Sequence, residues 1–227
     1  MYKYSLVLPC FNESLSLKEL IPRLVDLVEK NNVQFIIVNN GSTDKTSEIL
    51  SLIVNNHIKV ITLLDNQGYG GGIKAGLMQA SGEYIGWIHA DLQYSIGDIV
   101  RKLQSIEGRY DFIKGHRKNR VFMEKVISLL MSCFESILFT KILYDLNAQP
   151  TIFKKSFYNQ ILSGPDDFTL DLYAYVLAKK NNLAIKRFDV NFLNRTYGKS
   201  HWNSGLISIL RMILKNIIYS IKLRLIL

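Results

Sequence analysis

Short apolar runs alternate along this chain with longer segments in which apolar residues recur every three or four positions. The longer segments have the spacing of amphipathic helices, which bury one face. The short runs have the length and the β-branched and aromatic content of buried strands, and they lie at residues 4–9, 34–39, 58–64, 84–89 and 110–114. Strands that alternate with helices are typical of βαβ units. The pattern therefore predicts an α/β fold with a mainly parallel sheet flanked by helices.

Polar or glycine-rich sequence follows each of the first four predicted strands. The four segments read CFNES, NNGSTD, DNQGYGGG and HADLQ. Because ligands of such sheets gather at the carboxyl ends of the strands, we expect these loops to form one site. Ser16 and Glu19 have the spacing of a capping box, which predicts a helix start there and leaves Glu13 available to the site.

The segment HADLQ supplies candidate metal ligands. If the extended geometry of the strand continues, His89, Asp91 and Gln93 share one side, since side chains alternate faces. A divalent cation accepts imidazole, carboxylate and amide donors, and Mg²⁺ completes its shell with substrate phosphates and water. The alternative is that Asp91 caps a turn and His89 hydrogen-bonds inside the sheet.

The glycine-rich segment predicts a loop that approaches phosphate. Its glycines at positions 68, 70, 71 and 72 lead into a helix, so Gly70 is a candidate contact for a nucleotide through its backbone. A dinucleotide fingerprint would need glycine where Ile73 stands, and no Gly-Lys-Ser/Thr sequence occurs. A nucleotide is therefore expected to bind differently from both of those motifs.

The second half of the chain opens with a basic run at 115–120, after the fifth predicted strand. Such a run is either a solvated face or, at the site edge of the sheet, a place to hold phosphate. An apolar helix, a turn with a strand, a further helix and a last strand are predicted at 121–144, 147–156, 168–181 and 184–188. Asp171, near the start of the further helix, either faces the site or complements the helix dipole.

Length, composition, net charge and cysteine content limit the kinds of protein and partner that the sequence allows. The chain has 227 residues, 48% hydrophobic and 21% charged, which predicts one globular domain with a C-terminal extension. A net charge of +9 favours anionic partners, yet the basic residues are not interleaved with aromatics on one element, so we expect no nucleic acid. The two cysteines, Cys10 and Cys133, support neither a disulfide framework nor a zinc site, and a reducing cytosolic setting fits best. The first apolar run is too short for a signal peptide.

The C-terminal segment has a mixed character. We place a domain boundary between residues 204 and 205. A helix is expected there, with Ser204, at the boundary, and Ser208, Arg211, Lys215 and Lys222 on one stripe among isoleucines and leucines. No uninterrupted apolar stretch reaches the roughly 18 residues of a membrane-spanning helix. The segment predicts a basic amphipathic helix at the cytoplasmic surface of a membrane. The alternative is a helix packed on the domain or on a second copy, which leaves a homo-oligomer open.

The ordered set of motifs resembles a known family. VLPCFNES, IIVNNGSTDKT, NQGYGGGIKAGL, HADLQ, NAQPTIF and NRTYGKSHW, between about residues 5 and 202, are similar to those of family-2 glycosyltransferases. The similarity is strongest to the branch of dolichyl- and polyprenyl-phosphate sugar synthases. It implies a GT-A, Rossmann-like nucleotide-sugar-binding fold and an inverting transfer of sugar from a nucleotide-sugar donor to a polyprenyl phosphate, in the making of cell-surface glycans or glycoproteins.

The resemblance also assigns roles to residues. It implies that Pro9, Phe11, Glu13 and Asn40 hold the nucleoside, and that Asp91 and Gln93 serve an Mg²⁺ or Mn²⁺ ion and the diphosphate. Arg117 and Arg120 match the basic segment that meets acceptor phosphate, and Arg195 and Lys199 are expected to close over the site. The chain departs from the family by having His89 where an aspartate is usual, and NNGSTD where paired aspartates are more common.

Two alternatives to lipid-phosphate transfer remain open. If the acceptor is a sugar hydroxyl of a growing polysaccharide, a carboxylate must take its proton, and Asp171 is the first candidate. The loss of acidic residues near the diphosphate also allows a catalytically silent nucleotide-sugar-binding protein. Asp91, Asp171 and Arg117 are accordingly the expected catalytic residues.

Overall fold

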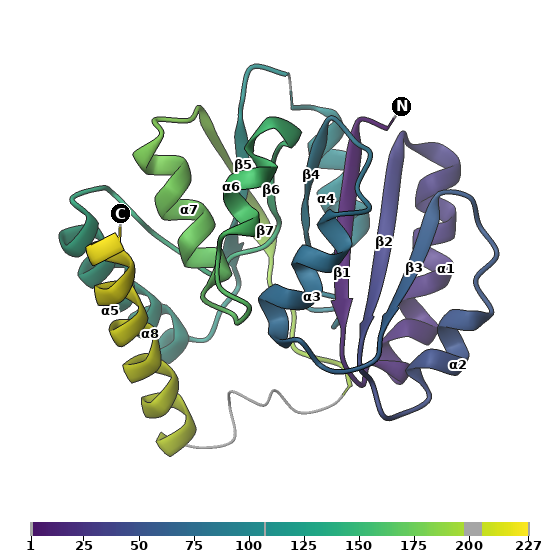
Figure 1. Cartoon of the computed structure of the whole chain (residues 1–227), viewed down its shortest axis with the longest axis horizontal. Helices are drawn as coiled ribbons and strands as arrows, with labels where there is room; N and C mark the ends of the chain where they lie inside the picture. Colours follow the sequence, from purple (N-terminus) through teal and green to yellow (C-terminus); the bar gives the residue numbers. More distant parts are fainter. Residues whose placement is uncertain (1, 107, 198–205, 227) are drawn as a thin grey trace.

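A seven-stranded sheet lies at the centre of the computed structural model, which describes residues 2–106, 108–197 and 206–226 (Figure 1). The strands are β1 (Tyr4–Cys10), β2 (Val33–Asn40), β3 (Ile58–Leu63), β4 (Tyr84–Trp87), β5 (Phe112–Lys118), β6 (Thr151–Lys154) and β7 (Ile185–Asn191). Their order in the sheet is β3-β2-β1-β4-β6-β5-β7. Only β6 pairs antiparallel with its neighbours within this described sheet. The predicted α/β class with a mainly parallel sheet is confirmed.

Helices cover both faces of the sheet. They are α1 (Ser14–Lys30), α2 (Thr46–Ser51), α3 (Gly68–Leu77), α4 (Ile96–Gln104), α5 (Phe122–Phe139), α6 (Tyr158–Leu162), α7 (Leu170–Lys180) and α8 (Leu206–Ile226), with a 3₁₀ turn at Lys155–Phe157. Buried side chains of α1, α2 and α4 join one core cluster, and those of α3, α6 and α7 join a second. The sheet thus forms the middle of three layers.

The alternation of side chains along the central strands builds these two cores. Leu6 and Leu8 of β1 belong to the first cluster, whereas Val7 belongs to the second, and all three are fully buried. Full burial of one such side chain stabilises the fold by about 1.5–3 kcal/mol. Gly76 lets α3 approach β1 closely, because a Cβ there would lie 2.4 Å from Cγ1 of Val7. The central strands are therefore held rigidly beneath the loops that follow them.

Among the differences from the predicted strand boundaries, two bear on the site. β4 ends at Trp87, two residues before the predicted end at His89. β5 continues beyond the predicted residue 114 to Lys118, because it pairs in parallel with β7 as far as the partners Lys118 and Asn191. Residues 115–118 of the basic run therefore lie within β5, so the prediction that the whole run follows the fifth strand was wrong. Arg117 is consequently part of a strand.

The C-terminal helix α8 packs along α5 (Figure 1). Leu223 of α8 is buried in the second core cluster, and the Ser220 hydroxyl hydrogen-bonds to the Glu135 carboxyl of α5. Within the described ranges, no helix combines the length and apolar character needed to cross a bilayer. The predicted boundary at 204/205, together with Ser204, lies outside the described residues.

Glu135 is a buried carboxyl whose pKa is raised in the folded protein. It is fully buried between α5 and α8, and its Oε2 atom has no hydrogen-bond partner among the described residues. Burial raises the pKa of Glu135 from 4.5 to about 7, although the Ser220 hydrogen bond acts in the opposite direction. The folded state therefore favours the protonated acid.

We expect Glu135 to make stability fall as pH rises. Its folded-state pKa lies above the unfolded value, so its stabilising contribution is complete below about pH 4.5 and is lost as pH rises through about 7. Glu135→Gln should remove this loss and exceed the wild type in free energy of unfolding by on the order of 2–3 kcal/mol above pH 8. Urea unfolding at pH 5 and pH 8 measures the difference, with exposed Glu83→Gln as the control. An unchanged pH dependence in Glu135→Gln would contradict the expectation.

Candidate active site

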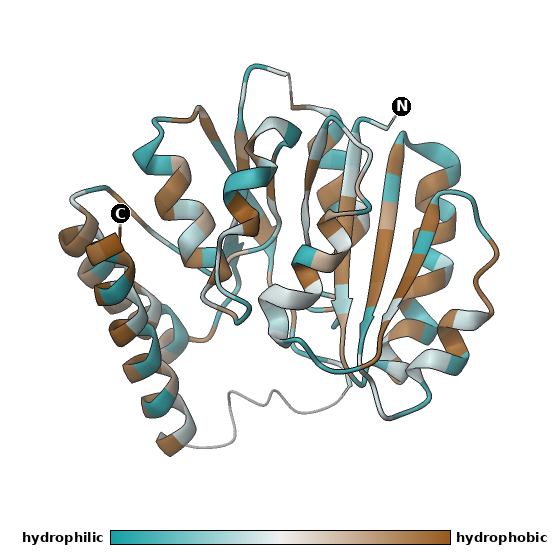
Figure 2. Cartoon of the chain, viewed as in Figure 1, coloured by the Kyte–Doolittle hydropathy of each residue, from teal (hydrophilic) through white to brown (hydrophobic). Residues whose placement is uncertain are grey.

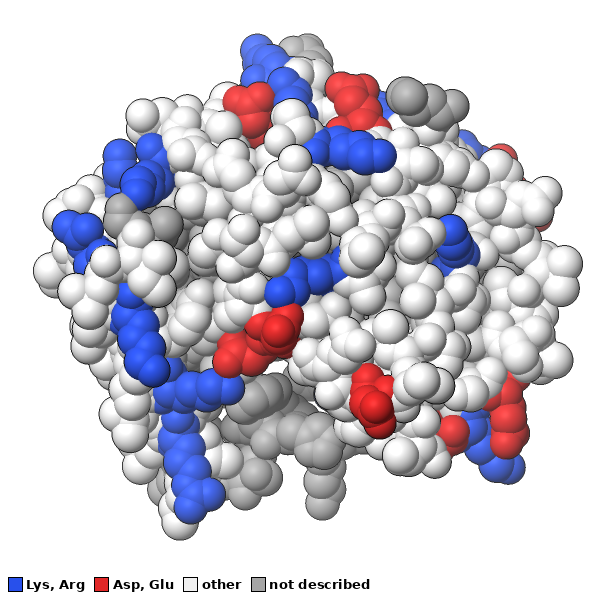
Figure 3. Space-filling model, viewed as in Figure 1, with Lys and Arg blue, Asp and Glu red and all other residues white. Residues whose placement is uncertain are grey.

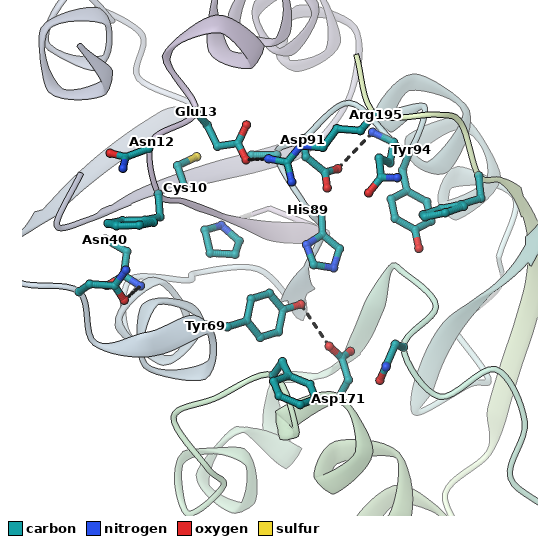
Figure 4. Close-up of a pocket in the computed structure, with 18 of the residues that line it drawn as sticks. Cys10, Asn12, Glu13, Asn40, Tyr69, His89, Asp91, Tyr94, Asp171 and Arg195 are labelled. Carbon is teal, nitrogen blue, oxygen red and sulfur yellow. Dashed lines mark hydrogen bonds and ion pairs between the residues drawn. The ribbon is translucent and has the colours of Figure 1, made fainter. Parts of the chain in front are cut away.

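A cavity of about 700 Å³ opens at the carboxyl edge of β1, β2 and β4, where parallel α/β sheets bind their ligands (Figure 4). Most of the side chains predicted to form a site line this cavity. They are Pro9, Phe11, Glu13, Asn40, His89, Asp91, Gln93, Arg117, Asp171 and Arg195. The polar loops after the strands thus converge on one cavity, together with residues from β5, α7 and the segment after β7.

Two predicted residues have other positions, and a third is not described. Gly70 is buried against the loop before α7, because a Cβ there would lie 2.3 Å from the carbonyl oxygen of Pro165, so its lack of a side chain serves packing. Arg120 turns towards α5, where it donates to the Ser128 hydroxyl and to the carbonyl of Glu124. Lys199 lies outside the described residues.

Glu13 is more constrained than the sequence predicted. Helix α1 begins at Ser14, so the expected capping box of Ser16 and Glu19 is wrong. The Ser16 hydroxyl instead donates to Oε2 of Glu13 at 2.6 Å, and Oε1 of Glu13 forms an ion pair with Arg195. This pair ties the segment after β7 to the start of α1 at the rim of the cavity.

Asn40 organises the loop that leads into α3. Its Nδ2 donates to the carbonyl oxygen of Gly68 at 2.8 Å, and its Oδ1 accepts from the backbone N–H of Gln67 at 3.0 Å. These two bonds require an amide rather than a carboxylate at position 40, because one partner is an acceptor and the other a donor. Asn40 is 4% exposed and lines the cavity beside Asn66.

Asp91 is the best-placed carboxylate for a cation. Its Oδ1 accepts from the backbone N–H of Gln93 at 3.1 Å, and no ion pair to Asp91 occurs in the described part of the chain. Gln93 donates its Nε2 to the carbonyl of Leu193, which leaves its amide oxygen available. Extended geometry does not continue through the segment, since Leu92 has φ 62°, yet His89, Asp91 and Gln93 all line the cavity.

This donor set fits a hard divalent cation that binds with its substrate. The described residues contain no group of three or more His, Cys, Asp or Glu side chains able to hold a metal alone. Mg²⁺ is usually bound through one or two carboxylates, with substrate phosphates and water completing its shell. Asp91 and the Gln93 amide oxygen meet that requirement when a diphosphate occupies the cavity.

His89 is the middle ring of an aromatic stack. Its ring centroid lies 5.3 Å from that of Tyr69, with an interplanar angle of 21°, and 6.2 Å from that of Tyr94, with an angle of 11°. Burial raises the pKa of both tyrosines, so both hydroxyls stay protonated at neutral pH. Tyr69 donates to Oδ2 of Asp171 at 3.1 Å.

Asp171 is the centre of a buried polar network. It is 3% exposed, and its Oδ1 accepts from Thr151 at 2.9 Å, Gln149 at 3.1 Å and Trp87 at 3.3 Å. Its Oδ2 accepts from Tyr69 and Gln149. The Lys114 ammonium lies 3.5 Å away, with its pKa lowered by burial to about 8 despite that carboxylate. All lone pairs of the Asp171 carboxylate are therefore engaged.

Arg117 forms a buried pair with Asp145 beside the cavity. Its Nε atom donates to Oδ1 of Asp145 at 2.8 Å, and its backbone N–H donates to Oδ2 at 2.6 Å. Burial opposes ionisation of Asp145, but the neighbouring Arg117 holds the pKa of the carboxyl below its ordinary value. Arg120 lies 3.6 Å from Asp145 and 3.8 Å from the carboxylate of Glu124, so two arginines face two carboxylates and their charges balance.

Several lining residues were not predicted as site residues. Tyr69 and Tyr94 lie inside or next to the motifs quoted above, but the interpretation of those motifs rested on their glycines and on Asp91. Phe192 and Met212 come from the segment after β7 and from α8, and their neighbouring sequence carries no ligand-binding pattern. Only tertiary packing brings these two to the cavity.

Comparison with known proteins identifies the class. The model of the glycosyl transferase family 2 matches residues 5–161. The undecaprenyl-phosphate 4-deoxy-4-formamido-L-arabinose transferase of Proteus mirabilis is 33% identical over 123 residues, which cover 52% of this chain and 38% of that protein. The protein of the same name from Photorhabdus laumondii is 36% identical over 123 residues, with the same coverage. The match thus spans well under half the length of these relatives.

A solved structure shares the fold. Glucosyl-3-phosphoglycerate synthase from Mycobacterium tuberculosis, in complex with Mn²⁺, UDP and phosphoglyceric acid, has a TM-score of 0.68 and 15% sequence identity, over 97% of this chain and 78% of that one. The fold is that of the GT-A class of α/β proteins. The chain belongs to glycosyl transferase family 2, as its motifs predicted.

Proposed function

We propose that this protein is an inverting glycosyltransferase that moves a sugar from a nucleotide-sugar donor to a polyprenyl phosphate, in cell-surface glycan or glycoprotein biosynthesis. The observation that carries the proposal is the state of Asp171, whose two oxygens already accept five hydrogen bonds. Glu13 is paired with Arg195. An acceptor with its own anionic oxygen needs no protein base, and the names of the two relatives specify such an acceptor.

The donor would lie across the strand ends. Pro9, Phe11, Glu13 and Asn40 would contact the nucleoside, and Asp91 with Gln93 would hold the cation and the diphosphate. A bound Mg²⁺ or Mn²⁺ would offset the negative charge that grows on the diphosphate as the glycosidic bond breaks. The Mycobacterium tuberculosis neighbour, crystallised with Mn²⁺ and UDP, supports this assignment.

The acceptor phosphate would enter from the side of Arg117. Arg117 and Arg195 both line the cavity and offer guanidinium groups to a phosphate, and Lys199 is proposed to join them. One phosphate oxygen attacks the anomeric carbon opposite the diphosphate and forms a new C–O bond. The old C–O bond breaks, and the nucleoside diphosphate leaves with its electron pair.

The decisive experiment varies the acceptor. Purified protein with Mg²⁺ or Mn²⁺ is given radiolabelled UDP-, GDP- and CDP-sugars and one of three acceptors: polyprenyl phosphate, the matching polyprenol, or a soluble oligosaccharide. Label in organic-extractable lipid with polyprenyl phosphate alone is the expected result. Label in polyprenol or oligosaccharide would favour a hydroxyl acceptor with Asp171 as base. Nucleotide binding without any transfer would indicate a silent binding protein.

We also propose that α5 and α8 rest on a membrane surface. Exposed apolar side chains follow α8 at helical spacing, at Ile207, Leu210, Leu214, Ile218, Ile221 and Leu225. Figure 2 shows that the ribbons of α8 and of the neighbouring α5 are both largely hydrophobic. Figure 3 shows lysine and arginine side chains spaced along α8, which carries Arg211, Lys215, Lys222 and Arg224 and no acidic residue. Basic and apolar residues together suit an anionic lipid interface on the cytoplasmic face.

Vesicle binding tests this surface. We expect the protein to sediment with vesicles that contain anionic lipid, and Leu214→Glu with Ile218→Glu to reduce the bound fraction at least tenfold, because two charges enter the apolar stripe. Val54→Glu, at a residue 96% exposed and far from α8 in the sequence, is the control. A wild type that stays in the supernatant as a dimer would assign the stripe to a second copy.

A further inference from the structure

We propose that His89 donates a hydrogen bond directly to the diphosphate of the donor, so that part of the nucleotide affinity needs no divalent cation. The inference rests on the proposed function, because it takes the occupant of the cavity to be a nucleoside diphosphate. His89 would then act as a binding residue for the leaving group. Its role would be separate from that of Asp91, two residues away.

The first support is the state of the imidazole nitrogens. His89 is half-buried and lines the cavity, and neither ring nitrogen has a hydrogen-bond or ion-pair partner among the residues that the structure describes. A neutral imidazole always carries one N–H donor, whichever nitrogen holds the proton. A ligand oxygen in the cavity can therefore provide the missing partner.

The second support is that the ring is held in place. Tyr69 and Tyr94 stack on its two faces, so the imidazole can turn little about its last side-chain bond. Each tyrosine is itself anchored: the Tyr69 hydroxyl donates to Asp171, and the Tyr94 hydroxyl accepts from the backbone N–H of Gln149 at 3.4 Å. Binding thus costs little further loss of side-chain freedom.

The third support is the balance of charge in the cavity. The carboxylates of Glu13 and Asp171 each have a cationic neighbour, Arg195 and Lys114, whereas Asp91 has none in the described part of the chain. A diphosphate adds further negative charge next to Asp91. An N–H donor at position 89 attracts that diphosphate without a cation, whereas a second carboxylate there would repel it unless a cation intervened.

Nucleotide binding with and without metal tests the proposal. UDP, GDP and CDP are titrated calorimetrically into wild type, His89→Phe and His89→Asp, in EDTA and again in Mg²⁺. His89→Phe keeps a ring between the two tyrosines but has no nitrogen. His57→Phe makes the same change at an exposed histidine of the surface, where the ring contacts Tyr2, and is the control.

The expected result is measurable wild-type binding of at least one nucleotide in EDTA. His89→Phe should weaken that binding about tenfold to a hundredfold, the range for a hydrogen bond to a charged group. His89→Asp should abolish binding in EDTA and recover it with Mg²⁺. His57→Phe should match the wild type. If His89→Phe does not fold, as judged by circular dichroism, the His89→Asp comparison decides.

Two results would count against the inference in different ways. Binding that requires Mg²⁺ in the wild type and is unchanged in His89→Phe would overturn the role of His89, and the proposed function would stand. Absence of binding for all three nucleotides, with and without Mg²⁺, would overturn the proposed function and this inference with it.

Discussion

Replacing Asp91 with asparagine is expected to slow sugar transfer by about a hundredfold to a thousandfold. The substitution removes the one lining carboxylate without a cationic neighbour in the described part of the chain, and with it the ligand that we propose for a cation beside the diphosphate. The fold should survive, because the asparagine oxygen can still accept from the backbone N–H of Gln93.

Initial rates at saturating donor and acceptor measure this effect. Mn²⁺ binding in the presence of UDP, followed by electron paramagnetic resonance, gives a second reading that does not depend on turnover. Asp26→Asn, at an exposed residue paired with Lys30 on α1, is the matched control and should leave both unchanged. Wild-type rates in Asp91→Asn would show that Asp91 serves neither the cation nor the diphosphate.

The sequence predicted the sheet and much of the cavity because both depend on local patterns. Strands such as β1 and β2 read as continuous apolar runs since both of their faces are buried, and their ends are marked by polar residues. Once parallel strands are assumed, the loops after them must meet at one edge. Glu13 and Asp91 were found in this way, whereas the family resemblance singled out Asn40.

The sequence did not predict contacts between residues that lie far apart along the chain. The extension of β5 to Lys118 depends on pairing with β7, which lies about seventy residues later in the chain. Glu13 pairs with Arg195, and Arg117 pairs with Asp145. No local sequence pattern indicates either pair. The hydrogen-bond donors to the Asp171 carboxylate likewise come from separate parts of the chain, namely α3, β4, β6 and the loop before β6.

Helix α8 packs on the rest of the chain, and its association with a membrane stays a proposal. The sequence set membrane association against packing on the domain. The structure buries Ser220 and Leu223 against the rest of the chain while Leu214 and Ile218 on another face stay exposed. Met212 of the same helix reaches the cavity wall. One helix therefore carries a buried face, a residue of the cavity wall and an exposed apolar stripe.

Replacing Arg117 with methionine is expected to lower the free energy of unfolding by about 3 kcal/mol and to abolish transfer. Removal of one partner from a buried ion pair leaves an uncompensated charge, which typically costs about 3–5 kcal/mol. Asp145 is 8% exposed, and only Arg120, at 3.6 Å, would remain to offset its charge. We therefore expect the lower end of that range.

A double variant separates the structural role of Arg117 from its role at the acceptor. Arg117→Met with Asp145→Asn removes both charges of the pair, and Arg120 keeps Glu124 as its ionic partner at 3.8 Å. The asparagine oxygen can still accept from the backbone N–H of residue 117. Urea unfolding should show most of the lost stability restored. If Arg117 contacts the acceptor phosphate, transfer should stay low in the double variant, with a raised KM for polyprenyl phosphate and an unchanged affinity for UDP. Full recovery of transfer together with stability would mean that Arg117 only supports the fold, and the acceptor phosphate would have to bind elsewhere.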